Sequence, residues 1–117
     1  MPLEDEYPHV HIADDLISNG SWSSASQPSA SQSSGVYFEG TNILVKIDGT
    51  STATDRDGVL FSAHYDSVST APGSTDDGMG VATLLQLVQY FAKNRPSRTA
   101  VFNINNGEED WLNGAHA

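Results

Sequence analysis

Two short apolar runs enclose a long amphipathic segment, and this order limits the possible folds more than any other feature of the sequence. Residues 59–63 and 100–105 are short apolar runs that predict strands. Residues 77–93 repeat apolar side chains at the i, i+3, i+4 spacing of a helix with one buried face. Asp77 occupies a helix-capping position, and Pro96 stops the helix from continuing. The order predicts a βαβ unit, in which a right-handed crossover joins two parallel strands.

The residues before this unit differ sharply in composition. Residues 1–35 are acidic and rich in serine, and such a stretch buries too little apolar surface to balance the entropy cost of ordering. We therefore expect a flexible segment there, with a loop at 18–34, and a folded domain over 36–117. Apolar and polar side chains alternate over 42–47, which predicts a strand antiparallel to residues 59–63. With the βαβ unit, this strand indicates an α/β fold with a mixed sheet.

Acidic residues outnumber basic ones by 15 to 5, which gives the 117-residue chain a formal net charge of −10. Such a field repels phosphate backbones and anionic lipid surfaces, so we expect neither nucleic acid nor a membrane as a partner of this segment. No apolar run reaches the roughly 18 residues of a membrane helix. The absence of cysteine excludes disulfides and thiolate metal sites. Asn19 begins an Asn-Gly-Ser glycosylation acceptor, for which a chance match is an equally good interpretation.

Ionisable side chains follow both predicted parallel strands and precede the helix. They are His64, Asp66, Asp76, Asp77, Glu108, Glu109 and Asp110. All belong to the sheet edge at which ligands of open α/β folds bind. Taken alone, each acidic pair is more typical of a helix start. Together, so many neighbouring carboxylates cannot all stay ionised unless a cation compensates them, and the pattern predicts a divalent metal site. Imidazole and oxygen donors without sulfur suit zinc, manganese or cobalt.

Three strings of the sequence, in this order, resemble the co-catalytic two-zinc aminopeptidases, a family of zinc metallopeptidases. The strings are Ala63-His64-Tyr65-Asp66-Ser67, Thr75-Asp76-Asp77-Gly78-Met79-Gly80 and Asn106-Gly107-Glu108-Glu109. The similarity extends over about residues 36–117. It implies part of a three-layer α/β/α sandwich, peptide substrates, and hydrolysis by a metal-activated water.

The resemblance assigns a role to each matched residue. His64 would bind one zinc ion, Glu109 the second, and Asp76 would bridge the two. Asp66 would accept a hydrogen bond from the other ring nitrogen of His64 and fix its tautomer, as carboxylates beside metal-bound imidazoles do. Glu108 would be the general base, taking a proton from the attacking water and returning it to the leaving amine.

The resemblance also implies a cis peptide bond between residues 76 and 77. It further indicates that two of the family's metal ligands are not among the matched residues. The family's site takes a further aspartate and a further histidine, which would come from loops beyond Ala117. We therefore expect an incomplete, inactive part of a peptidase domain. Asp110, His116 or the pair His9 and His11 are the local candidates for a replacement ligand, but a helix start and solvated surface positions are the simpler interpretations.

Two other interpretations compete with an enzyme. One is a non-catalytic module that keeps the peptidase fold for binding, and the other is a short truncated reading frame without activity. Truncation is favoured over the loss of catalysis that binding modules undergo, because the chain retains His64, Asp66, Asp76, Glu108 and Glu109. By resemblance, the protein belongs to the membrane of a fungal vacuole, with the peptidase domain facing the lumen.

Overall fold

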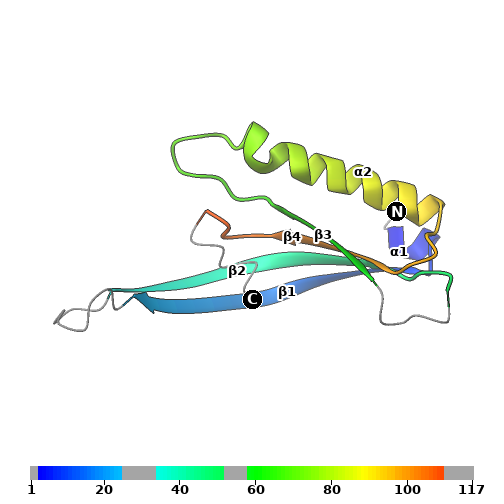
Figure 1. Ribbon diagram of the computed structural model, residues 1–117, viewed down its shortest axis with the longest axis horizontal. Coiled ribbons are helices and arrows are strands. Elements are labelled where there is room, and N and C mark those ends of the chain that lie inside the picture. The colour runs from blue at the N-terminus through cyan, green and yellow to red at the C-terminus, as the bar shows by residue number, and fades with distance from the viewer. Residues whose placement is uncertain (1–2, 25–33, 52–57, 110–117) are drawn as a thin grey trace.

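A mixed sheet carries a long helix on one of its faces in the computed structural model, which describes residues 3–24, 34–51 and 58–109 (Figure 1). The elements are α1 (Leu3–Glu6), β1 (Val10–Ser24), β2 (Ser34–Ile47), β3 (Val59–His64), the turn η1 (Ser74–Gly78), α2 (Met79–Lys93) and β4 (Ala100–Asn105). The four strands lie in the order β1-β2-β4-β3. These elements confirm the α/β class that the sequence predicts.

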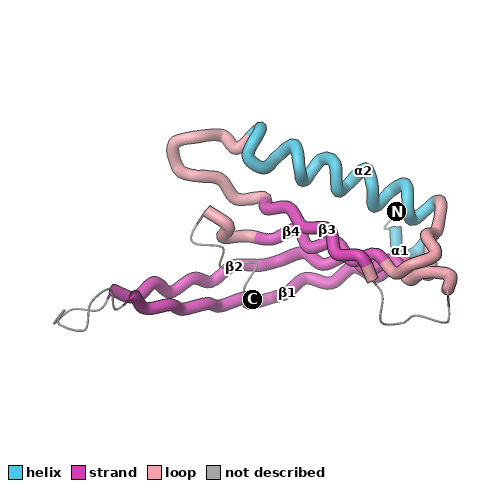
Figure 2. Tube along the Cα trace, in the orientation of Figure 1, coloured by secondary structure: helices cyan, strands magenta, loops and turns pink. Residues whose placement is uncertain are grey.

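The βαβ unit is present as expected. β3 and β4 are hydrogen-bonded in parallel, and α2 connects them along the chain (Figure 2). β2 pairs with β4 in antiparallel fashion, so the sheet is mixed. The predicted strand at 42–47 is the end of β2, and it runs antiparallel to β3 with β4 between the two. Because β3 and β4 are parallel, their carboxyl ends meet at one edge, beside the start of α2.

The prediction of a loop at 18–34 is wrong for residues 18–24. These residues form the second half of β1, which pairs with β2 from Val10 opposite Ile47 to Ser24 opposite Ser34. Figure 1 shows this hairpin extending well beyond β3 and β4. Ladder hydrogen bonds stabilise a serine-rich backbone that composition alone assigns to a loop. Residues 25–33 lie outside the described part of the chain, and the division of the chain at residue 35 stays a prediction.

The core lies between α2 and the sheet. Its buried members are Val10, Val45, Ile47, Ala63, Leu84, Val88, Ala92, Ala100 and Phe102. Phe102 is completely buried and stacks on Phe61 with ring centroids 5.0 Å apart. The helical spacing correctly predicts the buried face of α2, with the exception of Leu85, which is 49% exposed. Burial of this face holds the start of α2 over the carboxyl ends of the parallel strands.

The helix begins slightly later than predicted. α2 starts at Met79, and the preceding turn η1 is closed by a hydrogen bond from the Gly78 amide to the Gly73 carbonyl at 2.8 Å. Asp77 accepts the amide of Gly80 at 3.1 Å, so its carboxylate caps the first turn as expected. Among the described residues, no helix has the length and apolar character needed to span a membrane.

Candidate metal centre

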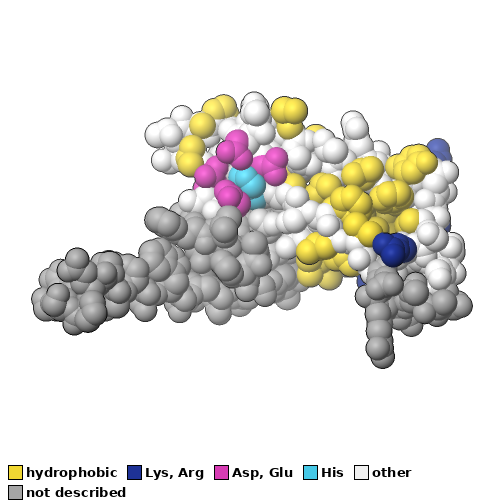
Figure 3. Space-filling model, viewed as in Figure 1, with side chains coloured by type: hydrophobic (Ala, Val, Ile, Leu, Met, Phe, Trp, Pro, Cys, Tyr) yellow, Lys and Arg dark blue, Asp and Glu magenta, His cyan; other side chains and the backbone are white. Residues whose placement is uncertain are grey.

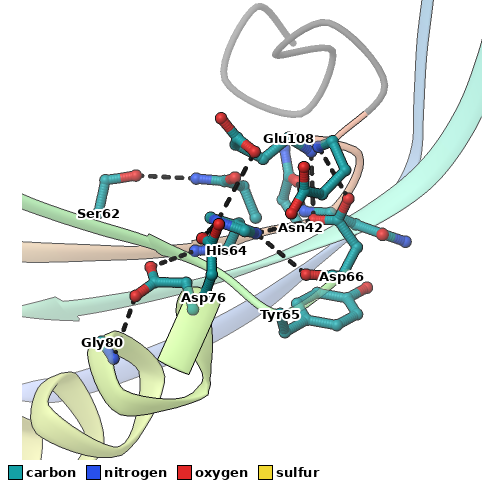
Figure 4. Close-up of polar contacts among 12 residues, drawn as sticks. Asn42, Ser62, His64, Tyr65, Asp66, Asp76, Gly80 and Glu108 are labelled. Carbon is teal, nitrogen blue, oxygen red and sulfur yellow. Dashed lines mark hydrogen bonds and ion pairs between the residues drawn. The ribbon is translucent and has the colours of Figure 1, made fainter. Parts of the chain in front are cut away.

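His64 is the last residue of β3, and the parallel strands hold it at the centre of the carboxyl-end edge. The residue is 8% exposed, and both ring nitrogens face oxygen atoms (Figure 4). Nδ1 lies 3.1 Å from the backbone carbonyl of Asp66, and Nε2 lies 3.0 Å from Oδ1 of Asp76. An imidazole can donate to acceptors at both nitrogens only when it is protonated, and a cation bound at one nitrogen would replace that proton.

Carboxylates from two further segments surround Nε2. Glu108, in the loop after β4, places Oε2 at 3.7 Å from it. Ligand atoms of His64, Glu108 and Glu109 all lie within 4.8 Å of one another, the spacing of a candidate metal site. Asp76 adds its carboxylate from η1, with 78% of the side chain exposed. Figure 3 shows acidic side chains gathered around a histidine on this face of the molecule.

The electrostatic balance of the site favours a cation. Burial lowers the pKa of His64, but hydrogen bonds to Asp66 and Asp76 and the charge of Glu108 outweigh burial and raise that pKa above 6.5. Desolvation raises the pKa of Glu109, and the charges of Asp76 and Glu108 raise it further. Desolvation is the larger cause for Glu109 and opposes the rise for His64, but nearby carboxylates raise the pKa of both groups. A proton or a metal ion relieves this excess of negative charge.

The adjacent acids of η1 point in different directions and serve different partners. The peptide bond between Asp76 and Asp77 is cis, which confirms the expectation from the resemblance. Asp76 contacts the ring of His64, whereas Oδ2 of Asp77 accepts the backbone amide of His64 at 3.3 Å. Through Gly80, Asp77 also contacts the first turn of α2. One acid therefore reaches into the site, and the other ties helix and strand together.

Asp66 lies close to His64, but its carboxylate has other partners. Its two oxygens accept the backbone amides of Glu108 and Glu109, each at 3.1 Å. The closest approach of the carboxylate to Nδ1 of His64 is 3.3 Å. The role of Asp66 in fixing the imidazole tautomer stays a prediction.

Sequence reasoning misses Asn42 as a residue that supports the site. Asn42 is 4% exposed, and its Oδ1 accepts the backbone amide of Asn106 at 3.0 Å. A polar residue at the start of an apolar alternation was the available signal, because a buried amide in a sheet needs partners. The pairing joins β2 to the loop after β4, across 64 residues of sequence.

The structure brings together the residues assigned by resemblance and places His9 and His11 away from them. His64, Asp66, Asp76, Glu108 and Glu109 all lie at the carboxyl-end edge. His9 lies at the other end of α2, where its Nε2 is 2.9 Å from the carbonyl of Ala92. His11 pairs with Asp48 at 2.8 Å. Asp110 and His116 lie outside the described residues, and Asn19 lies within β1.

Two open cavities adjoin the acidic cluster. One, of about 270 Å³, has a mainly apolar lining that consists of residues 67–68, 71–76 and Glu109. The other, of about 440 Å³, is more polar and is lined by residues 66–69, Asn106 and Glu109. Glu109 borders both, so a molecule bound in either cavity lies against the candidate metal ligands.

Comparisons with a family model and with curated relatives agree with the resemblance of the three motifs. The model of the family described as "Peptidase family M28" matches residues 42–117. The chain is 72% identical over 116 residues to the vacuolar membrane protease of Laccaria bicolor, covering 99% of this chain and 11% of that protein. It is 48% identical over 109 residues to the vacuolar membrane protease of Schizosaccharomyces pombe, covering 93% of this chain and 12% of that protein. The chain thus spans about 11% of the length of such relatives, and the resemblance read from the three motifs is confirmed.

Proposed function

The chain belongs to peptidase family M28, and on that premise we propose that it carries part of the active site of a zinc-dependent metallopeptidase of the aminopeptidase type. The observation that carries this proposal is the convergence of His64, Glu108 and Glu109, whose ligand atoms lie within 4.8 Å of one another. These residues come from segments separated by more than forty positions, and only the parallel pairing of β3 and β4 brings them together.

The donor set fits zinc. Imidazole and carboxylate are the usual ligands of catalytic zinc sites, and the chain has no cysteine that would indicate a structural thiolate site. His64 offers Nε2, and Asp76 lies 3.0 Å from that nitrogen. His64 and Asp76 would hold one ion, and Asp76 and Glu109 would hold a second, so that Asp76 would serve both. The raised pKa of His64 reflects the same negative field that would attract the ions.

Glu108 is the proposed proton carrier rather than a ligand. When bound, zinc supplies Lewis acidity that polarises a peptide carbonyl and makes water a better nucleophile. The carboxylate of Glu108 lies 3.7 Å from Nε2 of His64, so it stands beside the metal position. About one-third of this side chain is exposed, which leaves it open to substrate and water. It would take the proton of the attacking water and deliver it to the leaving amine.

A peptide substrate would use the cavities beside this centre. The apolar cavity of about 270 Å³ lies next to Asp76 and Glu109 and has room for a substrate side chain. The polar cavity of about 440 Å³ lies on the side of Asn106. If the side chain of a substrate residue occupies the apolar cavity, the peptide carbonyl of that residue would lie near the proposed ions. This arrangement supports a peptide as the substrate.

The proposal includes further parts of the domain. Leu44 and Leu60 lie on the sheet face opposite α2, where they are 37% and 67% exposed. Apolar side chains on that face support the three-layer sandwich, in which a second helical layer covers them. The family's remaining aspartate and histidine ligands would come from the same additional sequence. The names of the relatives support a place at the vacuole membrane, and we propose that the peptidase domain faces the lumen.

Zinc titration by calorimetry tests the metal assignment on the 117-residue chain near neutral pH. Without the two further ligands, we expect weak binding that His64→Gln abolishes. His11→Gln is the matched control, because His11 pairs with Asp48 away from the centre, and it should leave binding unchanged. Equal zinc binding by the unmodified chain and the His64→Gln variant would contradict the assignment. Loss of aminoacyl-peptide hydrolysis on Glu108→Gln in the full-length protein tests the activity.

A further inference from the structure

The loop that carries Glu108 and Glu109 is held by side-chain acceptors from other elements. The regular ladder reaches the end of β4, where the amide of Tyr65 donates to the carbonyl of Asn105 at 2.9 Å. Beyond it, the chain turns at Gly107, which has a φ of 79°. The amides of the loop must then find acceptors outside the sheet, because buried backbone donors are costly when unpaired.

Asp66 supplies two of those acceptors. Oδ1 takes the amide of Glu108 and Oδ2 takes the amide of Glu109, both at 3.1 Å (Figure 4). The side chain of Asp66 is only 16% exposed, so water competes weakly for the carboxylate. Hydrogen bonds from two successive amides to one ionised group are stronger than those to neutral acceptors.

The imidazole of His64 has a second acceptor besides this carboxylate. Its Nδ1 lies 3.1 Å from the backbone carbonyl of Asp66, closer than the 3.3 Å to the carboxylate oxygen Oδ1. A backbone carbonyl is a sufficient acceptor for an Nδ1 proton and orients the ring. Because no substitution of the Asp66 side chain removes that carbonyl, the two functions of this residue are separable.

We propose that Asp66 is a positioning residue for Glu108 and Glu109, whose backbone amides its carboxylate clamps by hydrogen bonds. This pair of hydrogen bonds fixes the loop backbone, so that Glu108 is positioned as proton carrier and Glu109 as metal ligand. Asn42 adds a third acceptor, at Asn106, on the other side of the turn. This inference rests on the proposed function, because the placement of the two glutamates matters only for a metallopeptidase.

Amide hydrogen exchange in the 15N-labelled chain, compared with its Asp66→Asn variant, tests the clamp. An asparagine side chain accepts through one oxygen only and turns a donor toward the other amide. Exchange at Glu108, Glu109 or both should accelerate roughly ten- to a hundredfold, the range for a lost hydrogen bond to a charged group. The Tyr65 amide should exchange at its original rate.

Asp48→Asn makes the same chemical change at an exposed aspartate and should leave the amides at 108 and 109 as they were. Unchanged exchange at both amides in Asp66→Asn overturns the proposal. Should Asp66→Asn fail to fold, scalar coupling across the hydrogen bond can be measured in the unmodified chain. Coupling between the Asp66 carboxylate carbon and the amide nitrogens of Glu108 and Glu109 supports the clamp, and its absence at both overturns it.

None of these measurements requires zinc. A result that contradicts the clamp is therefore distinguishable from a zinc titration that contradicts the metal assignment. In the full-length protein, Asp66→Asn should lower kcat with little change in KM, because the glutamates are misplaced but the substrate cavities remain. An unchanged kcat alongside accelerated amide exchange would refute a positioning role in catalysis.

Discussion

The carboxylate of Asp77 accepts the amide of Gly80 in the first turn of α2, at 3.1 Å. A Cβ atom at Gly80 would lie 2.1 Å from Oδ1 of Asp77, far inside van der Waals contact. The missing side chain at Gly80 therefore leaves the space that this carboxylate occupies. Since the other oxygen of Asp77 accepts the amide of His64, the same carboxylate connects the helix start to the candidate metal ligand.

A double-mutant cycle should reveal this packing. In the Asp77→Ala background, Gly80→Ala should stabilise the protein by roughly 1 kcal/mol, because alanine favours a helix over glycine. In the unmodified background the new methyl group displaces the carboxylate and breaks its hydrogen bonds, so that gain should vanish or reverse. The expected coupling is about 1–3 kcal/mol, measured by urea denaturation. Additive effects within experimental error would contradict the close contact.

Glu108 and Asp76 should respond differently to substitution in the full-length protein. Glu108→Gln should retain both zinc ions and lower kcat by about 10²–10⁴, the usual contribution of a general base. Asp76→Ala should lose both ions, since the bridging carboxylate serves each of them. Metal analysis after dialysis, with peptide hydrolysis measured in parallel, distinguishes the two. Two retained ions in Asp76→Ala would refute the bridge.

The metal-free chain should lose stability as the pH rises above 6.5 through the folded-state pKa of His64. The folded-state pKa of His64 lies above 6.5, because its hydrogen bonds to Asp66 and Asp76 and the charge of Glu108 outweigh burial. The folded state therefore binds the proton more tightly than the unfolded state. This stabilisation is complete below pH 6.5 and is lost as the pH rises through the folded-state pKa.

Thermal unfolding in the presence of a chelator, between pH 6 and pH 8, measures this loss. His64→Gln should flatten the dependence, because glutamine does not titrate. Saturating zinc should raise the unfolding temperature most at the alkaline end, where no proton competes for Nε2. An unfolding temperature that rises steadily over this range without metal would contradict the assigned direction.

Phe102 should be the costliest core position to truncate. It is completely buried, stacks on Phe61 and contacts Phe91 at 6.2 Å between ring centroids. Phe102→Ala should cost about 3–5 kcal/mol, since it removes a large apolar side chain and leaves a cavity. Leu85→Ala on the exposed side of α2 should change stability by only about 0.5 kcal/mol. Equal losses for the two variants, measured by denaturant unfolding, would disprove the assigned core.

Local patterns predicted the elements of the core well and failed where partners are distant. The spacing of Val81, Leu84 and Val88 is a helical signal that needs no knowledge of the sheet. Residues 18–24 carry no such signal. Their strand exists because β2 supplies hydrogen-bond partners along the whole hairpin, and serine content does not show where a partner lies.

Sequence by itself determined the identity of the chemical groups at the site and their order along the chain. His64 follows one strand and Glu108 the other, and the crossover topology predicts that both belong to one edge. Tertiary structure alone decided the contacts among them: which oxygen of Asp76 faces Nε2, that Asp66 accepts the amides of the glutamate loop, and that Asn42 holds Asn106. Periodicity is a property of neighbouring residues, whereas hydrogen bonds between loops depend on distances that only the packed sheet and helix define.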